Sequence, residues 1–135
     1  MMSYKKYDSL REGPYSGKTM VWLDPDYNVI SPLIKFLRED GLKILATGDP
    51  EVAEKLINEE HAEYFLSELI LPDVEVPETL SYILRLSRQH PEMKVGVLSN
   101  VDLAPYEIPS NMLSLRKVSL LPSELESAIN EYWLS

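Results

Sequence analysis

The sequence predicts an α/β fold in which short apolar strands alternate with amphipathic helices. Three observations carry this prediction. Short apolar runs recur along the chain, turn residues follow each run, and helical periodicity fills most of the segments between them. Such alternation is typical of a parallel sheet with helices on both faces. A chain of 135 residues is long enough for one domain of this kind.

The first half of the chain reads as two strand–helix units. Residues 19–23 form a buried strand that ends at Asp24. The next helix is predicted from Ser31 to Gly41, because Ser31 is followed by proline at a first helical position and glycine commonly ends helices. Residues 42–47 form the second strand, and Asp49 caps the helix after it.

The second half continues the alternation. The third strand covers residues 62–71, and the third helix runs from Pro77 to His90. Residues 95–98 form the fourth strand, and residues 117–121 form the fifth. The last helix opens with the capping box Ser123-x-x-Glu126.

Residues 101–114 are predicted to form a loop where a fourth helix would be expected. They contain Pro105 and Pro109, and prolines four residues apart do not suit a helix interior. We therefore expect no regular helix across residues 103–111. The apolar side chains expected to cover the sheet are Leu103, Tyr106, Ile108 and Met112.

Charge divides the chain into two parts. Residues 1–18 carry a net charge of +2, whereas residues 19–135 hold nine basic and twenty acidic side chains and a net charge of −11. We expect a flexible tail over residues 1–18 and a folded domain over residues 19–135. An acidic body repels nucleic-acid phosphates and anionic membrane surfaces, so neither is an expected partner.

The composition also narrows the sites and the location. The absence of cysteine removes disulfides, thiolate zinc sites and cysteine nucleophiles. Two histidines are too few for a histidine-rich metal centre. No apolar run is long enough to span a membrane, and the first residues lack the apolar core of a signal peptide. A cytoplasmic protein is expected.

The candidate site follows from the strand order. Five parallel strands with right-handed crossovers favour the flavodoxin-like order 2-1-3-4-5, with helices on both faces. Folds of this kind place their sites at the carboxyl ends of the strands. Asp24 ends the first strand, Glu68 the third, Ser99 the fourth and Leu121 the fifth, and Asp26 lies two residues beyond Asp24.

This arrangement resembles the receiver domain of two-component response regulators, the CheY-like fold. The resemblance runs from about Met20 to Trp133, and its most specific parts are Glu68-x-x-Leu71-Pro72 and Leu121-Pro122. It implies transfer of a phosphoryl group from a partner kinase to an aspartate within a phosphorelay. Two acids after the first strand and the acceptor would hold Mg²⁺. A hydroxyl residue, here Ser99, and a lysine would bind the phosphoryl oxygens.

Three positions depart from that pattern. Pro25 replaces the second acid and leaves Asp26 one residue further on, Glu68 replaces the acceptor aspartate, and Leu121 replaces the lysine. Mg²⁺ requires near-octahedral oxygen ligands at fixed distances, so no metal or other cofactor is expected, with Asp24 and Glu68 as the weak candidates. The resemblance therefore implies a pseudo-receiver, a non-catalytic signalling and protein-interaction module without normal aspartyl phosphorylation.

The residues leave alternatives open. Glu68 either mimics the phosphorylated state or is a drifted residue. Without a lysine at position 121, Asp24 and Glu68 would face each other unpaired and repel, unless Lys117 or a divalent ion neutralises them. The alternative functions are an atypical phospho-switch and a small haloacid-dehalogenase-like phosphatase that uses Asp24.

The expected partner is a protein, such as a kinase or another signalling protein, and a homodimer stays open. Four side chains are candidates for contact with it: Tyr106, Val118 at the aromatic switch position of the family, Tyr132 and Trp133. The alternative for the last two is that Trp133 covers the core while Tyr132 lies on the surface.

Overall fold

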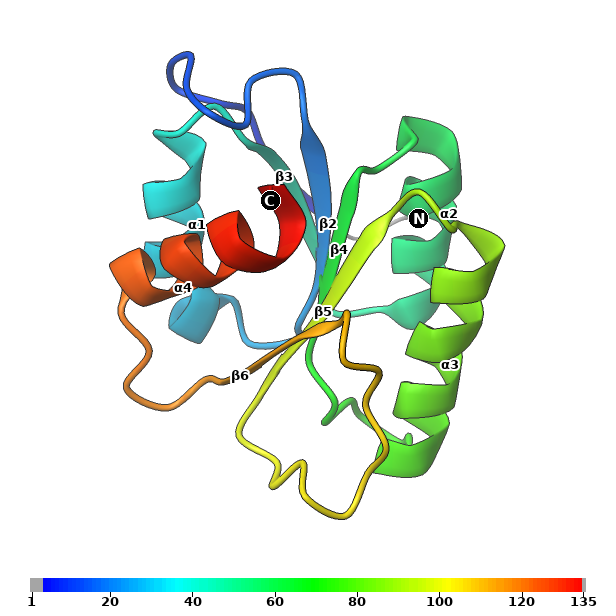
Figure 1. Ribbon diagram of the computed structural model, residues 1–135. Helices are drawn as coiled ribbons and strands as arrows, with labels where there is room; N and C mark the ends of the chain where they lie inside the picture. Colours follow the sequence, from blue (N-terminus) through cyan, green and yellow to red (C-terminus); the bar gives the residue numbers. More distant parts are fainter. Residues whose placement is uncertain (1–3, 135) are drawn as a thin grey trace.

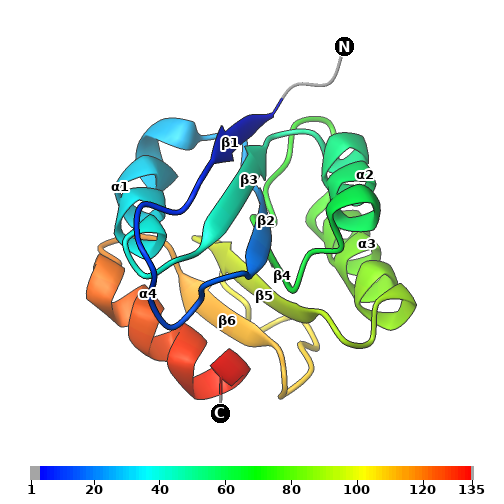
Figure 2. The same cartoon turned by 90° about the horizontal axis from the view of Figure 1, so that it is seen from above.

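The computed structural model describes residues 4–134 as one six-stranded sheet between two pairs of helices (Figures 1 and 2). The strands are β1 (Lys5–Tyr7), β2 (Thr19–Leu23), β3 (Lys43–Thr47), β4 (Tyr64–Ser67), β5 (Lys94–Ser99) and β6 (Leu113–Arg116). The helices are α1 (Tyr27–Arg38), α2 (Pro50–Glu60), α3 (Val76–Gln89) and α4 (Pro122–Ile129), and α4 continues into the π-helical turn η1 (Asn130–Leu134).

The sheet order is β1-β3-β2-β4-β5-β6. The strands from β2 to β6 pair in parallel, and their order is the predicted 2-1-3-4-5. Helices α1 and α4 cover one face, and α2 and α3 cover the other (Figure 2). The predicted α/β fold is therefore confirmed. Among the described residues, no helix is both long and apolar enough to cross a membrane.

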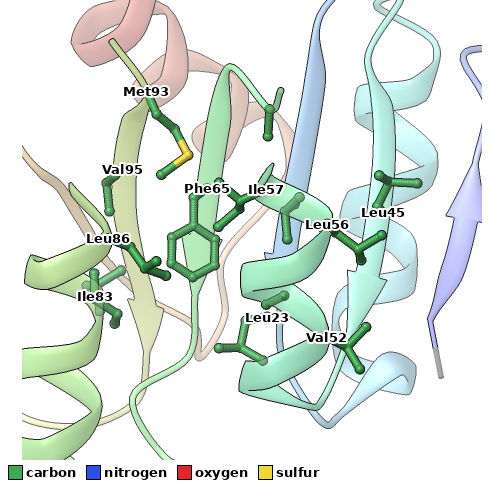
Figure 3. Packing of buried hydrophobic residues seen from close by; sticks show 14 of the residues in the cluster. Leu23, Leu45, Val52, Leu56, Ile57, Phe65, Ile83, Leu86, Met93 and Val95 are labelled. Carbon is green, nitrogen blue, oxygen red and sulfur yellow. The ribbon is translucent and has the colours of Figure 1, made fainter. Parts of the chain in front are cut away.

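Two apolar clusters fill the space between the sheet and its helices. One lies under α2 and α3, where Phe65 and Leu23 meet Leu56 and Ile83 (Figure 3). The other lies under α1 and α4 and includes Trp22. Successive side chains of a strand point to opposite faces of the sheet. Because β2 is apolar at every position from Met20 to Leu23, it contributes side chains to both clusters.

The N-terminal segment is packed, which corrects the expected tail. Residues 5–7 pair antiparallel with β3 as a sixth strand. Tyr15 is fully buried, and its hydroxyl donates a hydrogen bond to Asn130 Oδ1 at 2.6 Å. Basic residues suggested a solvated tail, yet lysines are common on edge strands, where they do not prevent pairing. Residues 1–3 of the expected tail lie outside the described residues.

Two helices begin earlier than the sequence suggested. Asp26 caps α1 by accepting a hydrogen bond from Val29 N at 3.3 Å, so Pro32 lies inside the helix instead of at its start. Helix α4 begins at Pro122, before the proposed capping box. At α1 the boundary moved because the Asp26 side chain reaches an amide of the first turn, and at α4 the Glu124 side chain accepts a hydrogen bond from the amide of Leu121, the residue before the helix.

The third and fifth strands also differ from their predicted ranges. Strand β4 ends at Ser67, where the predicted strand continued to residue 71. Strand β6 ends at Arg116, and the predicted strand over residues 117–121 is a turn closed by a 3.2 Å hydrogen bond from Leu120 N to Lys117 O. Ser119 has a φ of 60° in this turn, a conformation that a strand cannot contain.

Residues 101–112 form the predicted loop, and the structure has no helix in this segment. Leu103, Tyr106 and Ile108 pack against the cluster under α2 and α3, and Met112 is buried within it. The predictions that this loop replaces the fourth helix and covers the sheet are confirmed.

A carboxyl pair joins α4 to the end of α1. A hydrogen bond between the protonated Glu126 carboxyl and Asp40, burial and the Asp40 charge together raise the pKa of Glu126 to about 7. Asp40 Oδ2 is buried and accepts no hydrogen bond in the described chain. Protonation of Glu126 would provide a donor beside it.

We expect this pair to make stability fall as pH rises. The pKa of Glu126 in the folded state exceeds its ordinary value of 4.5, so protonation favours the fold, and the benefit is lost as pH rises through about 7. Glu126→Gln keeps a donor and removes the titration. Its melting temperature should exceed that of the parent at about pH 8, and the difference should disappear near about pH 5. Glu59→Gln, on the exposed side of α2, is the control, and a difference independent of pH would contradict the prediction.

Candidate functional site

Four polar side chains meet at the carboxyl edge of the sheet. Asp24 follows β2, Glu68 follows β4, Ser99 ends β5 and Lys117 follows β6. Asp24 and Ser99 are fully buried, Glu68 is nearly so, and the Lys117 side chain is only 8% exposed. We call these four residues the carboxylate–lysine cluster.

Backbone hydrogen bonds beyond the strand ends fix where these side chains start. Asp24 N donates to Thr47 O at 2.8 Å, Glu68 N donates to Leu23 O at 2.8 Å, and Lys117 N donates to Ser99 O at 3.2 Å. The residue after each strand is therefore held in line with its neighbour. Parallel strands place these ends at one edge, so their side chains converge.

Lys117 bridges the two acids. Its Nζ lies 2.6 Å from Asp24 Oδ2 and 2.7 Å from Glu68 Oε2. The expectation that these carboxylates face each other unpaired is wrong, and Lys117, one of the two alternatives, neutralises them. Removal of one partner from such a buried ion pair strongly destabilises the fold, because the remaining charge stays buried without a partner.

Leu121 is not part of the site. Its side chain is exposed, and it precedes α4 with its amide donating to Glu124 Oε1 at 2.8 Å. The sequence comparison placed the lysine position next to Pro122, whereas four residues separate Lys117 from that proline. The alternation of Leu113 and Leu115 with polar residues is the signal that could have placed β6, and so Lys117, correctly.

Both carboxylate oxygens of Glu68 are engaged. Oε1 accepts hydrogen bonds from Ser99 Oγ, from Leu69 N at 2.8 Å and from Ile70 N at 3.0 Å. Oε2 accepts from Lys117 Nζ. An ionised carboxylate has about four acceptor positions, and this one has four donors. Glu68 is therefore held as a fully satisfied internal anion.

Asp24 and Asp26 have different roles. Asp24 Oδ1 accepts from Asp26 N at 2.8 Å, while the Asp26 carboxylate is exposed and caps α1. The structure therefore does not bring the Asp26 side chain into the cluster. Burial raises the pKa of Asp24, and this outweighs the lowering by Lys117 and the Asp26 amide. Burial lowers the pKa of Lys117, but its bonds to Asp24 and Glu68 outweigh that and raise it.

The donor set does not fit Mg²⁺. The Lys117 ammonium stands between the two carboxylates, and the oxygens that a metal would need already accept hydrogen bonds. Mg²⁺ requires near-octahedral oxygen coordination. In the described chain, no group of three or more histidine and acidic side chains is arranged to hold a metal ion.

The candidate contact residues lie in different surroundings. Tyr106 is partly buried in the loop over α3, Val118 is exposed in the turn after β6, and Tyr132 is exposed on η1. Trp133 is buried and stacks on Tyr64, with ring centroids 4.9 Å apart. Trp133 thus belongs to the core, as the alternative expectation had it, while the contact roles of the other three remain predictions.

We expect Lys117→Met to be destabilised by about 3–5 kcal/mol, because two carboxylates stay buried without a cation. Burial already raises the pKa of Asp24, and loss of the Lys117 cation raises it further, so the stability of this variant falls as pH rises through the raised pKa. Urea unfolding at about pH 5 and about pH 8 measures this, with the larger loss at the higher pH.

Lys55→Met is the matched control. Lys55 is exposed on α2 and pairs with Glu59 at 3.8 Å, an interaction worth at most about 0.5 kcal/mol. Equal losses for Lys117→Met at both pH values, or a loss no larger than the control, would contradict the structural role of the ion pair.

No protein-family model and no curated protein matches this chain. Solved structures match it closely in fold. A response regulator receiver domain protein from Clostridium thermocellum has a TM-score of 0.70 at 15% identity, over 85% of this chain and 93% of that one. The receiver domain of an HD domain-containing protein from Pseudomonas fluorescens Pf-5 has 0.70 at 18% identity, with the same coverage. Response regulator TrrA from Thermotoga maritima has 0.71 at 16% identity, over 85% and 98%. This chain therefore has the fold of response regulator receiver domains.

Proposed function

We propose that this chain is a signalling module of the receiver type that acts through a protein partner and accepts no phosphoryl group at Glu68. One observation carries the proposal. The Glu68 carboxylate is bound by both the Ser99 hydroxyl and the Lys117 ammonium. In the receiver family that the sequence resembles, a hydroxyl residue and a lysine bind the phosphoryl oxygens instead.

The same contacts argue against phosphoryl transfer to Glu68. A nucleophilic carboxylate needs a free oxygen, and here one oxygen accepts three donors while the other faces Lys117. The structure of TrrA was solved with Mg²⁺ and BeF. In this chain Pro25 stands where the second acid would help hold such a cation, and Asp26 is turned away to cap α1.

Glu68 also supports a switch that is fixed in one position. Its side chain is one methylene longer than aspartate, and this length lets one carboxylate reach Ser99 and Lys117 together. A residue at this position without a function would not be expected to bind both the Ser99 hydroxyl and the Lys117 ammonium. We infer that Glu68 mimics the phosphorylated state, and that the module is constitutively competent to bind a cytoplasmic protein.

The buried Asp24 does not favour the phosphatase alternative. A nucleophilic aspartate must meet its substrate, whereas Asp24 is fully buried with Oδ1 on the Asp26 amide and Oδ2 on Lys117. The proposed module is therefore not an enzyme and uses no cofactor.

Intact mass after treatment with acetyl phosphate and Mg²⁺ tests the proposal. We expect no added phosphoryl group on the parent. The double variant Pro25→Asp with Glu68→Asp restores the second acid and the acceptor, so it should gain a labile adduct. An ordinary receiver domain treated in parallel shows that the donor is active. A stoichiometric adduct on Glu68 of the parent would overturn the proposal.

A second experiment tests the fixed switch. Glu68→Ala removes the anion that holds Ser99 and Lys117, so the segments after β5 and β6 should loosen. We expect faster hydrogen exchange at Val101 and Val118, whose amides bond to Ser99 Oγ at 3.2 Å and Asn100 Oδ1 at 2.6 Å.

Amides within β2 provide the reference for that measurement, and Glu59→Ala, which removes an exposed acid of α2, is the control. Unchanged protection at positions 101 and 118 in Glu68→Ala would mean that these segments are ordered without Glu68. That result would favour a drifted residue.

A further inference from the structure

We propose that the carboxyl edge of the sheet is a docking surface for a basic polypeptide segment that carries apolar side chains. This inference rests on the proposed function, since it names the surface and the class of partner for a module that binds without phosphorylation. The edge consists of the loops that follow the strands, which gather at the lower end of Figure 1.

Exposed aliphatic side chains collect at this edge. Of the seven large apolar side chains that are exposed in the described chain, four lie here, at 45% to 61% exposure. They are Val29, Ile70, Val118 and Leu121. Single exposed apolar residues are ordinary, whereas a group of them at one edge is a candidate interaction surface.

The buried cluster and Asp26 fix the backbone that carries three of these side chains. Ile70 N donates to Glu68 Oε1, and Val118 directly follows Lys117. Val29 N donates to Asp26, whose own amide donates to Asp24. An apolar surface that is already ordered loses little conformational entropy when a partner binds.

The exposed charge at the same edge is mainly acidic. Its loops span residues 24–26, 48–49, 68–75, 100–112 and 117–121, and Lys117 is the only basic residue within them. Two exposed cations lie beside these loops: Arg116 donates to Asn100 O at 3.3 Å, and Lys5 Nζ lies 4.8 Å from the centroid of the Tyr27 ring. Because Lys117 is buried between Asp24 and Glu68, its charge is not presented to a partner. The exposed acids are Asp26, Asp49, Asp73, Glu75, Asp102 and Glu107.

Charge complementarity therefore selects the occupant. The helices begin at this edge, and their N-terminal partial charges would favour an anion, but Asp26 and Asp49 cap two of them and offset that charge. The remaining acids repel a phosphorylated or otherwise anionic segment. A segment with lysine or arginine beside apolar residues complements both the charge and the aliphatic side chains, and acidic loops would steer it to the edge.

Binding of a labelled peptide in which lysines alternate with leucines tests this proposal. Fluorescence anisotropy gives its affinity, and ¹⁵N-labelled protein shows where it binds. Shifts should concentrate in the edge loops. Ile70→Ser with Val118→Ser should weaken binding about tenfold or more, since central apolar contacts dominate interfaces. Asp73→Asn with Asp102→Asn should weaken it mainly at low salt, where charge attraction is least screened.

The matched control is Leu10→Ser, which removes an exposed apolar side chain away from this edge and should leave binding unchanged. Equal weakening by this control, or equal binding of a peptide with glutamate in place of lysine, would overturn the proposal. Self-association through Ile70 and Val118 in sedimentation would assign the edge to a second copy and also overturn it. The binding assay contains no phosphodonor. A phosphoryl adduct on Glu68, found separately by intact mass, would therefore refute the proposed function without changing what the binding assay says about the docking surface.

Discussion

Lys117 is the cation on which the carboxyl edge depends. Asp24 and Glu68 are buried on neighbouring strands, and burying two carboxylates together is costly unless a cation and hydrogen bonds compensate them. The ammonium comes from beyond β6, on the far side of β5, so one side chain joins three strand ends.

The parallel core could be predicted because it is apolar on both faces. Strands such as β2 and β5 read as continuous apolar runs, and their ends are marked by Asp24 and Ser99. Strand β6 lies at the edge of the sheet and is only half buried, so its apolar and polar residues alternate over a short range. The segment over residues 117–121 is more apolar and was predicted as the strand in its place. Its side chains Val118 and Leu121 are exposed at the surface instead.

Three of the four cluster residues were therefore identified from the sequence, and the fourth was displaced with its strand. The residues around Asp26 in the sequence also could not show which of two roles its side chain has. Asp26 could enter the cluster or cap α1, and only the position of the first helical turn settles which it does. The packing of Tyr15 was likewise hidden, because it depends on Asn130, 115 residues away.

That long-range contact has a consequence for how the chain is made. Tyr15 is synthesised 115 residues before Asn130, whose side-chain oxygen accepts the hydrogen bond from the Tyr15 hydroxyl. Contacts between distant parts of a chain are slow to form, since the intervening residues must first be ordered. The N-terminal segment therefore completes its packing only after α4 and η1 have been synthesised, and folding of this domain finishes after translation of its last helix.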